Sequence, residues 1–283
     1  MRPATEGGAS VTAAEALPRE NVFGHTRKVQ LLRDACTRLR RSRVTLRILD
    51  VGCGSGYAVT RYLGDSQDEV LGIDLYAPNI DYANRTFARA GLRFECRSAE
   101  SLVSAQLQFD VIVLADVLEH LDQPGAVLSE CRRLLAPEGV LLITVPNGHG
   151  PFELESALSR TRWLGPSLLK LTEYFVAALN KYGPLRGRWT QALAEIPAGL
   201  PYNAESGHVN FFSRASLDAL VAGAHFSVQR RANLSLFSGP FSNFLFAAFP
   251  GFIAWNVATA QRVPARLVSG WFLECSGALP ART

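Results

Sequence analysis

A cluster of glycines directly follows an apolar run and an aspartate in the first part of the chain. Residues 48–56 read ILDVGCGSG, and a second apolar run, VLGID at 70–74, also ends in an aspartate. A glycine inside a regular element costs roughly 0.5–1 kcal/mol relative to alanine, so a cluster of them needs a local reason. The usual reason is close approach of a ligand to the backbone, with the N–H groups at the start of the next helix free to bind a carboxylate or phosphate. The sequence therefore predicts a ligand-binding loop at 50–56, followed by a helix in the segment YAVTRYLG.

The spacing of these glycines restricts the class of ligand. Nicotinamide dinucleotides are bound by loops with the spacing G-x-G-x-x-G, whereas this loop has G-x-G-x-G, with Asp50 two residues before its first glycine. The difference favours another nucleotide-like cofactor. An NAD-dependent oxidoreductase is the rival enzyme class on the same type of sheet.

The elements that position this loop follow an α/β pattern between residues 48 and 145. Short runs rich in Val, Ile and Leu alternate with segments of helical periodicity, which is typical of a parallel sheet covered on both faces. Helices are expected from Pro78 to Gly91 and in the segment that ends at Pro137. The expected strands are RILDV, EVLGIDL, LRFECRS, FDVIVLAD and VLLITV. In such a doubly wound sheet the ligand lies outside the carboxyl ends of the strands, where the glycine loop and Asp74 stand.

The rest of the chain does not follow this regular alternation of strands and helices. Residues 151–207 have helical periodicity and no obvious strand, and alternation resumes in HVNFF at 208. A helix is then expected from Ser213 through Ala224, and strands in FSVQRRANLSL and GWFLECSGAL. The predicted organisation is a flexible tail (1–20), a cofactor-binding core (21–150), a helical cap insertion (151–207), a continuation of the core (208–231), an apolar helical cap or membrane-facing insertion (232–266) and a last core strand (267–283).

Composition and charge exclude several classes of protein. The chain has 283 residues, of which 48% are hydrophobic and 19% charged, as expected of a globular protein with a sizeable core. Its five cysteines include no C-x-x-C pair, which argues against a disulfide framework or a zinc site and favours a reducing cytosol. Residues 1–20 lack the apolar core of a signal peptide. The arginine-rich segment 27–47 is interpreted as a solvated helix face, with an anionic partner as the alternative.

Four motifs, in this order along the chain, resemble those of the class I S-adenosylmethionine-dependent methyltransferases. They are LDVGCGSG, GIDL, SAE at 98–100, and ADVLEHL at 115–121 running on to LLAPEGVLLITVPN. The LEHL and TVPN phrases are most similar to the ubiquinone-type small-molecule O-methyltransferases. The resemblance covers roughly residues 44–147, and a weaker resemblance extends over residues 208–230. It implies a Rossmann-like methyltransferase fold with a mainly parallel seven-stranded sheet and helical cap insertions, and S-adenosylmethionine as the cofactor.

The resemblance also implies roles for individual residues. The glycines would admit the methionine end of the cofactor, Asp50 would lie near its ammonium group, and Asp74 would accept both ribose hydroxyls. Ala99 and Glu100 match positions that border the adenine. The alternatives are a helix cap for Asp74, a surface turn residue for Glu100 and a small filler for Cys53. The implied cofactor-binding set is Asp50, Gly52, Cys53, Gly54, Gly56, Asp74, Leu75, Ala99, Glu100, Asp116 and Val117.

Histidines are the candidates for a general base, because a hydroxyl acceptor must lose a proton at some stage. His208 is the first candidate, since relatives bring the chain back over the acceptor after such an insertion, and His149, just past the fifth strand, is the second. The position of His120 is usually structural in the family. No metal site is expected, because no set of His, Asp and Glu at ligand spacing occurs in this region. Nucleic acid is not expected as a partner, because ADVLEH replaces the Pro-Pro-aromatic phrase of base-methylating relatives.

A stretch without any charged residue, 232–261, is the second predicted cap element. It and 151–207 both follow strands expected to be parallel to the first, so both should leave the sheet at its ligand-binding edge. Their aromatic content suggests an apolar acceptor. The alternatives for 232–261 are a hairpin lying on a membrane, anchored by arginines at both ends, and a membrane-spanning helix. Its prolines and glycines favour two short helices with weak membrane contact at most.

Together these observations predict a methyltransferase that acts on a small, largely apolar or lipid-linked acceptor, at a hydroxyl oxygen. The expected location is cytoplasmic, with peripheral contact to a membrane surface. The alternative functions are a membrane-associated binding protein that keeps the methyltransferase fold without turnover, and the NAD-dependent oxidoreductase. The identity of the acceptor, the methylated atom and the oligomeric state are left open by the sequence.

Overall fold

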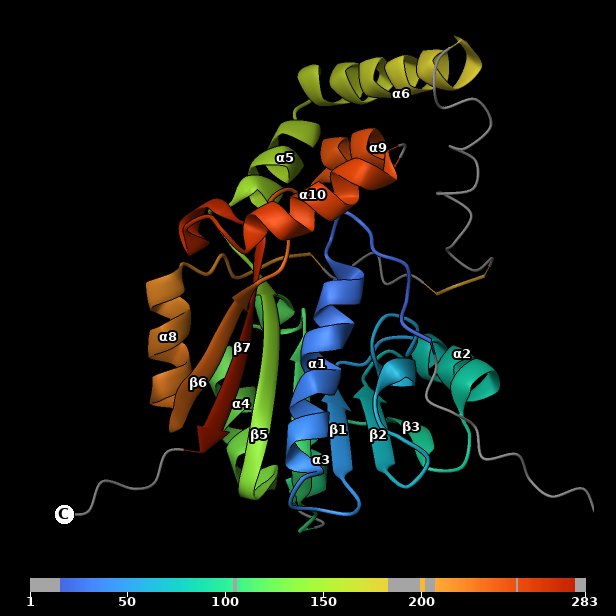
Figure 1. The fold of residues 1–283 in the computed structure, drawn as a ribbon. Helices are drawn as coiled ribbons and strands as arrows, with labels where there is room; N and C mark the ends of the chain where they lie inside the picture. Colours follow the sequence, from blue (N-terminus) through green and yellow to red (C-terminus); the bar gives the residue numbers. More distant parts are fainter. Residues whose placement is uncertain (1–15, 104–105, 183–198, 202–206, 248, 278–283) are drawn as a thin grey trace, which may run out of the picture.

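The protein is built around one seven-stranded sheet, in the order β3-β2-β1-β4-β5-β7-β6 (Figure 1). The computed structural model describes residues 16–103, 106–182, 199–201, 207–247 and 249–277. All strand pairs are parallel except those of β7, which is antiparallel to both β5 and β6. The strands are β1 Arg47–Val51, β2 Glu69–Asp74, β3 Leu92–Cys96, β4 Phe109–Ala115, β5 Leu135–Pro146, β6 Phe226–Asn233 and β7 Gly270–Gly277. The predicted mainly parallel seven-stranded sheet is confirmed.

Helices cover both faces of the sheet because the central strands are apolar on both sides. Ile48 and Leu49 of β1 are adjacent and fully buried, and they belong to opposite core layers, as the alternation of side chains in a strand requires. One layer contains side chains of α1 His25–Leu39 and α2 Ala77–Phe87. The other contains side chains of α3 Ala99–Val103, α4 Pro124–Leu134 and α8 Arg214–Gly223.

The predicted helices α2, α4 and α8 form at the positions that the sequence patterns indicated. Pro78 lies in the first turn of α2, and Ile80, Ala83 and Phe87 are its buried face. Ser213 forms a capping box with Ser216 at the start of α8, which satisfies two backbone donors that the helix itself leaves free. The strand order reverses between β1 and β4, and this reversal is where an open α/β sheet binds its ligand.

Two local predictions are wrong. The segment after the glycine loop forms only a 3-10 turn, Thr60–Tyr62, instead of a helix. The Arg61 guanidinium stacks 4.5 Å from the ring centres of Tyr57 and Tyr62, which holds this segment in a tighter turn. The HVNFF segment forms no strand, because the N–H groups of Val209 and Asn210 both donate to the carbonyl oxygen of Glu119, at 2.8 and 3.0 Å.

The arginine-rich segment is not a simple solvated face. Arg38 pairs with Glu274 of β7 at 2.5 Å, and Arg40 pairs with Asp65 at 3.1 Å and with Asp68. Arg43 pairs with Asp110 at the start of β4. These guanidinium groups therefore bind carboxylates of the sheet and its loops, and several of them fix α1 and the following turn against the body of the protein.

Four helices lie above the carboxyl edge of the parallel strands (Figure 1). They are α5 Pro151–Ser159 and α6 Leu164–Tyr182, which follow β5, and α9 Pro240–Ala247 and α10 Pro250–Ala260, which follow β6. The expected division of 232–261 into two short helices is confirmed. Among the described residues no helix has the length and apolar character needed to cross a membrane. Parts of the predicted tail (1–15), of the 151–207 insertion (183–198 and 202–206) and of the last strand (278–283) lie outside the described residues.

Candidate functional site

The three glycines after β1 all have positive φ angles, of 71° at Gly52, 54° at Gly54 and 72° at Gly56, a region that suits glycine. They serve two different purposes. A Cβ atom on Gly52 would lie 2.7 Å from Cγ2 of Val117, and one on Gly56 would lie 2.7 Å from the ring of Phe94. Within 4 Å, a Cβ atom on Gly54 would meet only the side-chain nitrogen of Asn79, at 3.8 Å. Gly52 and Gly56 therefore allow tight internal packing, and Gly54 leaves open space for a ligand.

Asp74 ends β2 and accepts backbone N–H groups from the glycine loop and from the turn that follows the strand. Its Oδ2 accepts the N–H of Gly54 at 2.9 Å, and its Oδ1 accepts the N–H of Tyr76 at 2.8 Å. Each carboxylate oxygen has further acceptor capacity, so the fixed group can still bind two hydroxyls. Leu75, next to it, is 75% exposed, which leaves an apolar surface beside this carboxylate.

Asp50 is almost fully buried, with 1% of its surface exposed. The hydroxyl of Thr60 donates to its Oδ2 at 2.6 Å, and its Oδ1 has no hydrogen-bond partner in the described part of the chain. Burial, reinforced by the nearby charge of Asp74, raises the pKa of Asp50 to about 7. An unpartnered carboxylate oxygen at this depth favours a cationic neighbour, so the residue fits the expected ammonium group of a cofactor.

Three further residues at this edge differ in their surroundings. Ala99 is buried at the start of α3, and Glu100 is exposed in its first turn. The sulfur of Cys53 packs against β2, 3.0 Å from the position of a Cβ atom on Gly72, and burial raises the pKa of its thiol. The Cys53 side chain therefore packs against the sheet.

Asn79 is a candidate that the sequence analysis missed. It lies in the first turn of α2, is buried, and its Oδ1 has no hydrogen-bond partner in the structure as described. Its position beside Gly54 places this amide at the open part of the loop. The available signal was its place in the helix that begins directly after Asp74, but only the folded structure brings it next to the glycines.

Asp116 follows β4 and has a positive φ angle of 56°. Thr144 of β5 donates to its Oδ1 at 2.9 Å, and Lys28 of α1 donates to its Oδ2. Partial desolvation opposes the charge of this carboxylate, but the attraction of Lys28 and the two hydrogen bonds outweigh it and lower the pKa of Asp116. Asp116 is therefore an ionised carboxylate in a fixed orientation, directly before Val117.

A cavity of about 200 Å³ opens beside Asp116 at the carboxyl ends of β4 and β5. His208 lines it, and the Nδ1–H of His208 donates to Oε1 of Glu153 on α5 at 2.6 Å. The ring of Phe152 lies 5.5 Å from that of His208. His149 is exposed and does not line this cavity. Of the two predicted bases, the structure brings only His208 to the end of β4.

Two more side chains gather beside His208. Glu119 and His120 both line the same cavity, and the rings of His120 and His208 meet edge to face with centroids 4.9 Å apart. Each of the three side chains offers one ligand atom, and these atoms lie within 4.8 Å of one another. The spacing of residues along the sequence did not indicate this cluster. His208 is far from Glu119 and His120 along the chain and joins them only through the fold.

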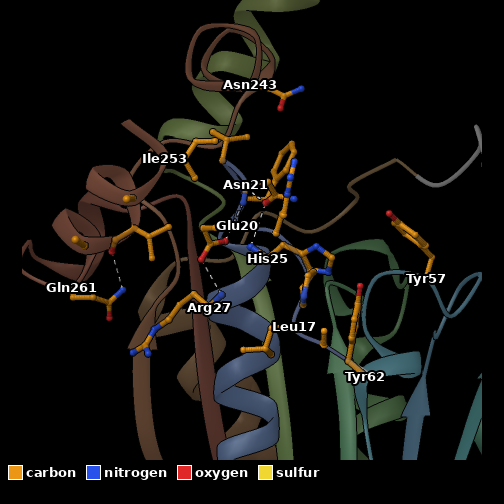
Figure 2. Close-up of a pocket in the computed structure, with 18 of the residues that line it drawn as sticks. Leu17, Glu20, Asn21, His25, Arg27, Tyr57, Tyr62, Asn243, Ile253 and Gln261 are labelled. Carbon is orange, nitrogen blue, oxygen red and sulfur yellow. Dashed lines mark hydrogen bonds between the residues drawn. The ribbon is translucent and has the colours of Figure 1, made fainter. Parts of the chain in front are cut away.

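A second, larger cavity of about 1180 Å³ lies between the N-terminal segment 16–27 and the cap helices α9 and α10 (Figure 2). Tyr57 and Tyr62 line it from the side of the glycine loop, and Ile253 lines it from α10. Phe23 lines both cavities. The buried Asn256 joins the two walls of the larger cavity, because its amide donates to the carbonyl oxygens of Val22 at 3.2 Å and of Phe237 at 2.8 Å.

Comparison with known proteins defines the family. A family model described as a methyltransferase domain matches residues 23–230, which is more than half of the chain. A ubiquinone biosynthesis O-methyltransferase of Cereibacter sphaeroides is 34% identical over 121 residues, which cover 42% of this chain and 48% of that protein. The protein of the same name from Dinoroseobacter shibae is 36% identical over 104 residues, which cover 36% of this chain and 42% of that protein. The chain thus spans about half the length of the curated relatives it matches.

Solved structures agree in fold. An S-adenosylmethionine-dependent methyltransferase from Clostridium acetobutylicum has a TM-score of 0.53 to this chain, with 10% sequence identity over 89% of this chain and 92% of that one. The structure of PKMT2 from Rickettsia typhi has a TM-score of 0.51, with 15% identity over 83% of this chain and 49% of that one. At such low identity the likeness concerns the architecture alone.

Sheet order, glycine loop and family match define the class: a class I S-adenosylmethionine-dependent methyltransferase. The chain belongs to the methyltransferase domain family. Its cofactor is S-adenosylmethionine, and the residues present fit that molecule. The unpartnered oxygen of buried Asp50 suits a cation, the space above Gly54 admits a ligand, and the fixed carboxylate of Asp74 suits a diol.

Proposed function

We propose that this protein methylates a hydroxyl oxygen of a small, largely apolar or lipid-linked acceptor. The observation that carries the proposal is the pairing of two cavities. The small cavity beside Asp116 presents His208. The large one has aromatic and aliphatic side chains of the cap and the N-terminal segment, such as Phe23 and Ile253, beside charged groups such as Arg27. The aromatic and aliphatic part of this lining suits the apolar body of an acceptor whose hydroxyl reaches the small cavity. The names of the curated relatives, ubiquinone biosynthesis O-methyltransferases, support the same class of acceptor.

The bound cofactor supplies an activated methyl group on a sulfonium, so the main tasks of the chain are alignment, exclusion of water and removal of a proton. His208 is suited to the last task. Because the Glu153 carboxylate can only accept a hydrogen bond, it holds the proton of His208 on Nδ1. The Nε2 atom is then the unprotonated nitrogen, which can accept the proton of an acceptor hydroxyl.

We propose the cofactor-binding roles of the residues around the glycine loop as the resemblance implied them. Asp50 binds the ammonium group, Asp74 the ribose hydroxyls, and Ala99 with Glu100 borders the adenine. Asn79 joins this set, because its unpartnered amide oxygen lies beside the open face of Gly54. The negative charge of Asp116 and the apolar Val117 then separate the cofactor from the acceptor cavity.

Peripheral contact with a membrane surface is part of the same proposal. The helix α6 exposes Leu171, Tyr174 and Phe175, which are 63, 76 and 52% exposed. It lies at the outer end of the cap, away from the sheet (Figure 1). An exposed row of large apolar side chains is costly in water and favours a lipid surface. Such contact would bring a lipid-linked acceptor to the large cavity.

The test is a methyl-transfer assay with labelled S-adenosylmethionine and a catechol that carries a prenyl chain. The expected product is the mono-O-methyl ether. We expect His208→Ala to lower kcat by roughly 100-fold or more with unchanged affinity for S-adenosylmethionine, as when general-base assistance is lost. The exposed His225, at the turn before β6, provides the control His225→Asn, which should retain full activity. Failure to methylate any such catechol, or methylation of amine analogues instead, would contradict the proposal.

A further inference from the structure

We propose that Phe23 selects the acceptor, because it joins a site for one aromatic ring to a site for an apolar chain. Of the described residues that line the two cavities, only Phe23 belongs to both linings. The two cavities therefore adjoin at this side chain, and we call this place the junction. The nature of the head group rests on the proposed function, whereas the binding of an apolar chain against Phe23 does not.

The volumes of the two cavities limit what each can hold. The small cavity has about 200 Å³, and a cavity of about 150 Å³ is enough for one benzene ring. A single ring with its hydroxyl groups therefore fills most of the small cavity. The large cavity has about 1180 Å³, which exceeds the range of about 300–1,000 Å³ that is common for ligand pockets. A chain attached to the ring has room in the large cavity, and it reaches that cavity past Phe23.

The turn that carries Phe23 is fixed against the sheet. The side-chain oxygen of Asn21 accepts the N–H groups of Phe23, at 3.0 Å, and of His25, at 3.2 Å. Gly24 has a φ angle of 71°, and a Cβ atom there would lie 3.3 Å from backbone atoms of Leu234, directly after β6. The backbone at position 23 is therefore held in place by the protein itself.

The cap is attached to the same turn. The buried side chain of Asn256 in α10 donates from Nδ2 to the carbonyl oxygen of Val22, at 3.2 Å. Movement of α10 away from the turn would break this bond and leave a buried carbonyl group without its partner, which is unfavourable. The width of the junction is therefore determined by the side chain at position 23 rather than by opening of the cap.

The exposure of the Phe23 ring indicates what kind of chain the junction binds. The residue is 42% exposed, so part of an apolar ring contacts water. A hydrocarbon chain that lies against the ring removes this surface from water, and the buried apolar area adds to the affinity. Ile253, Ala254 and Val257 of α10 are further apolar side chains in the lining of the large cavity. The structure thus assigns to Phe23 a preference for acceptors with an apolar chain over the bare ring.

The first experiment compares catechol with geranylcatechol as acceptors, using labelled S-adenosylmethionine. We expect the KM of the wild type to be roughly 10-fold or more lower for geranylcatechol than for catechol, and Phe23→Ala to lose most of this difference, because one apolar contact is removed. The kcat for catechol should stay within about twofold, since the lost contact binds the chain and not the reacting ring. Phe211→Ala is the matched control, because Phe211 is 49% exposed and lines neither cavity.

The second experiment measures binding without turnover. Geranylbenzene has the same chain and no hydroxyl group, so its binding to protein saturated with S-adenosylhomocysteine does not depend on methyl transfer. Isothermal titration should show roughly 10-fold weaker binding to Phe23→Ala than to the wild type or Phe211→Ala, and an intermediate affinity for Phe23→Leu, which keeps a smaller apolar side chain. Titration with S-adenosylmethionine and the melting temperature show whether each variant is folded.

The outcomes separate this inference from the proposed function. Binding of geranylbenzene that depends on Phe23 supports the inference even if no catechol is methylated, and in that case only the proposed function fails. Equal binding by the wild type and the folded Phe23→Ala or Phe23→Leu variants overturns the inference, and so does a wild type that does not bind geranylbenzene. A preference for geranylcatechol that is unchanged in Phe23→Ala overturns it as well.

Discussion

Lys28 on α1 donates a hydrogen bond to Oδ2 of Asp116 at the end of β4, so an ion pair links the N-terminal helix to the site. The lysine side chain is 10% exposed and the aspartate side chain 42%. The second oxygen of the same carboxylate accepts from Thr144. Asp116 is thereby fixed in a left-handed backbone conformation that non-glycine residues seldom adopt. The pair therefore positions a site residue as well as α1.

Loss of this pair should destabilise the protein. For Lys28→Met we expect the free energy of unfolding to fall by about 1–3 kcal/mol, because a hydrogen bond to a charged group is lost and the carboxylate stays partly buried. Lys28→Arg keeps the charge and should lose less. The exposed Lys170 on α6 gives the control Lys170→Met, with an expected change below about 0.5 kcal/mol. Urea denaturation measures all three, and equal losses for Lys28→Met and Lys170→Met would contradict a role of the pair.

Asp74, which is half-buried at the end of β2, should contribute strongly to the affinity for the cofactor. Asp74→Ala removes the carboxylate that accepts from Gly54 and Tyr76 and that we propose binds two ribose hydroxyls. We expect isothermal titration to show S-adenosylmethionine bound about 10- to 150-fold more weakly, corresponding to about 1.5–3 kcal/mol. Asp81→Ala, on the exposed face of α2, is the matched control. Similar affinities for the two variants would remove Asp74 from the binding site.

Asp50 should make stability depend on pH. Burial raises its pKa from 3.8 to about 7 in the folded chain, so the folded state binds more protons than the unfolded state between these values. The free energy of unfolding is then highest below about pH 4 and falls as the pH rises through 7. From pH 5 to pH 8 the expected contribution is a loss of about 2–3 kcal/mol.

The variant Asp50→Asn isolates this effect, because the amide oxygen can still accept from Thr60 but carries no charge. Urea denaturation at pH 5 and pH 8 should show a smaller pH-dependent loss in Asp50→Asn than in the wild type. Saturating S-adenosylmethionine should reduce the loss in the wild type, since its ammonium group stabilises the ionised carboxylate. An identical pH profile for the two proteins would show that Asp50 titrates as an ordinary carboxyl group.

The exposed side of α6 should carry any membrane contact. We expect the wild type to float with anionic liposomes in a salt-sensitive manner, and Leu171→Glu with Tyr174→Glu to abolish flotation. Val44 is 82% exposed before β1, at the opposite edge of the sheet from the cap, and Val44→Glu is the control. A wild type that ignores liposomes, or a double variant that still floats, would exclude α6 as the contact.

The sheet could be predicted from the sequence because its signals are local. The apolar run 48–51, the helix opened by Pro78 and the cap at Ser213 each lie within one element, and the structure has each of them. The motif order also predicted that Asp50 and Asp74 stand at one edge of the sheet, where β1 and β2 pair in register.

The acceptor cavity could not be predicted in the same way because its contacts join distant segments. His208 meets Glu153 across 55 positions, and His120 meets Gly207 across 87. No spacing rule connects such residues, so the cluster with Glu119 escaped detection. The turn at Thr60 was missed for a related reason. Its side chain binds buried Asp50, and that tertiary contact overrides the helical pattern of the segment.

The residues on either side of the α9–α10 segment continue the backbone hydrogen bonding between β6 and β7. Asn233 lies opposite Trp271, the N–H of Leu234 donates to Gly270 at 3.0 Å, and the N–H of Ser269 donates to Ser235 at 2.9 Å. The two ends of the intervening 33 residues therefore stand about one strand spacing apart, roughly 5 Å. A two-residue turn could join them without moving a strand. The α9–α10 segment, which lines part of the larger cavity, is thus joined to the sheet at one place. We expect that its exchange between relatives would alter the proposed choice of acceptor and leave the sheet and the glycine loop unchanged.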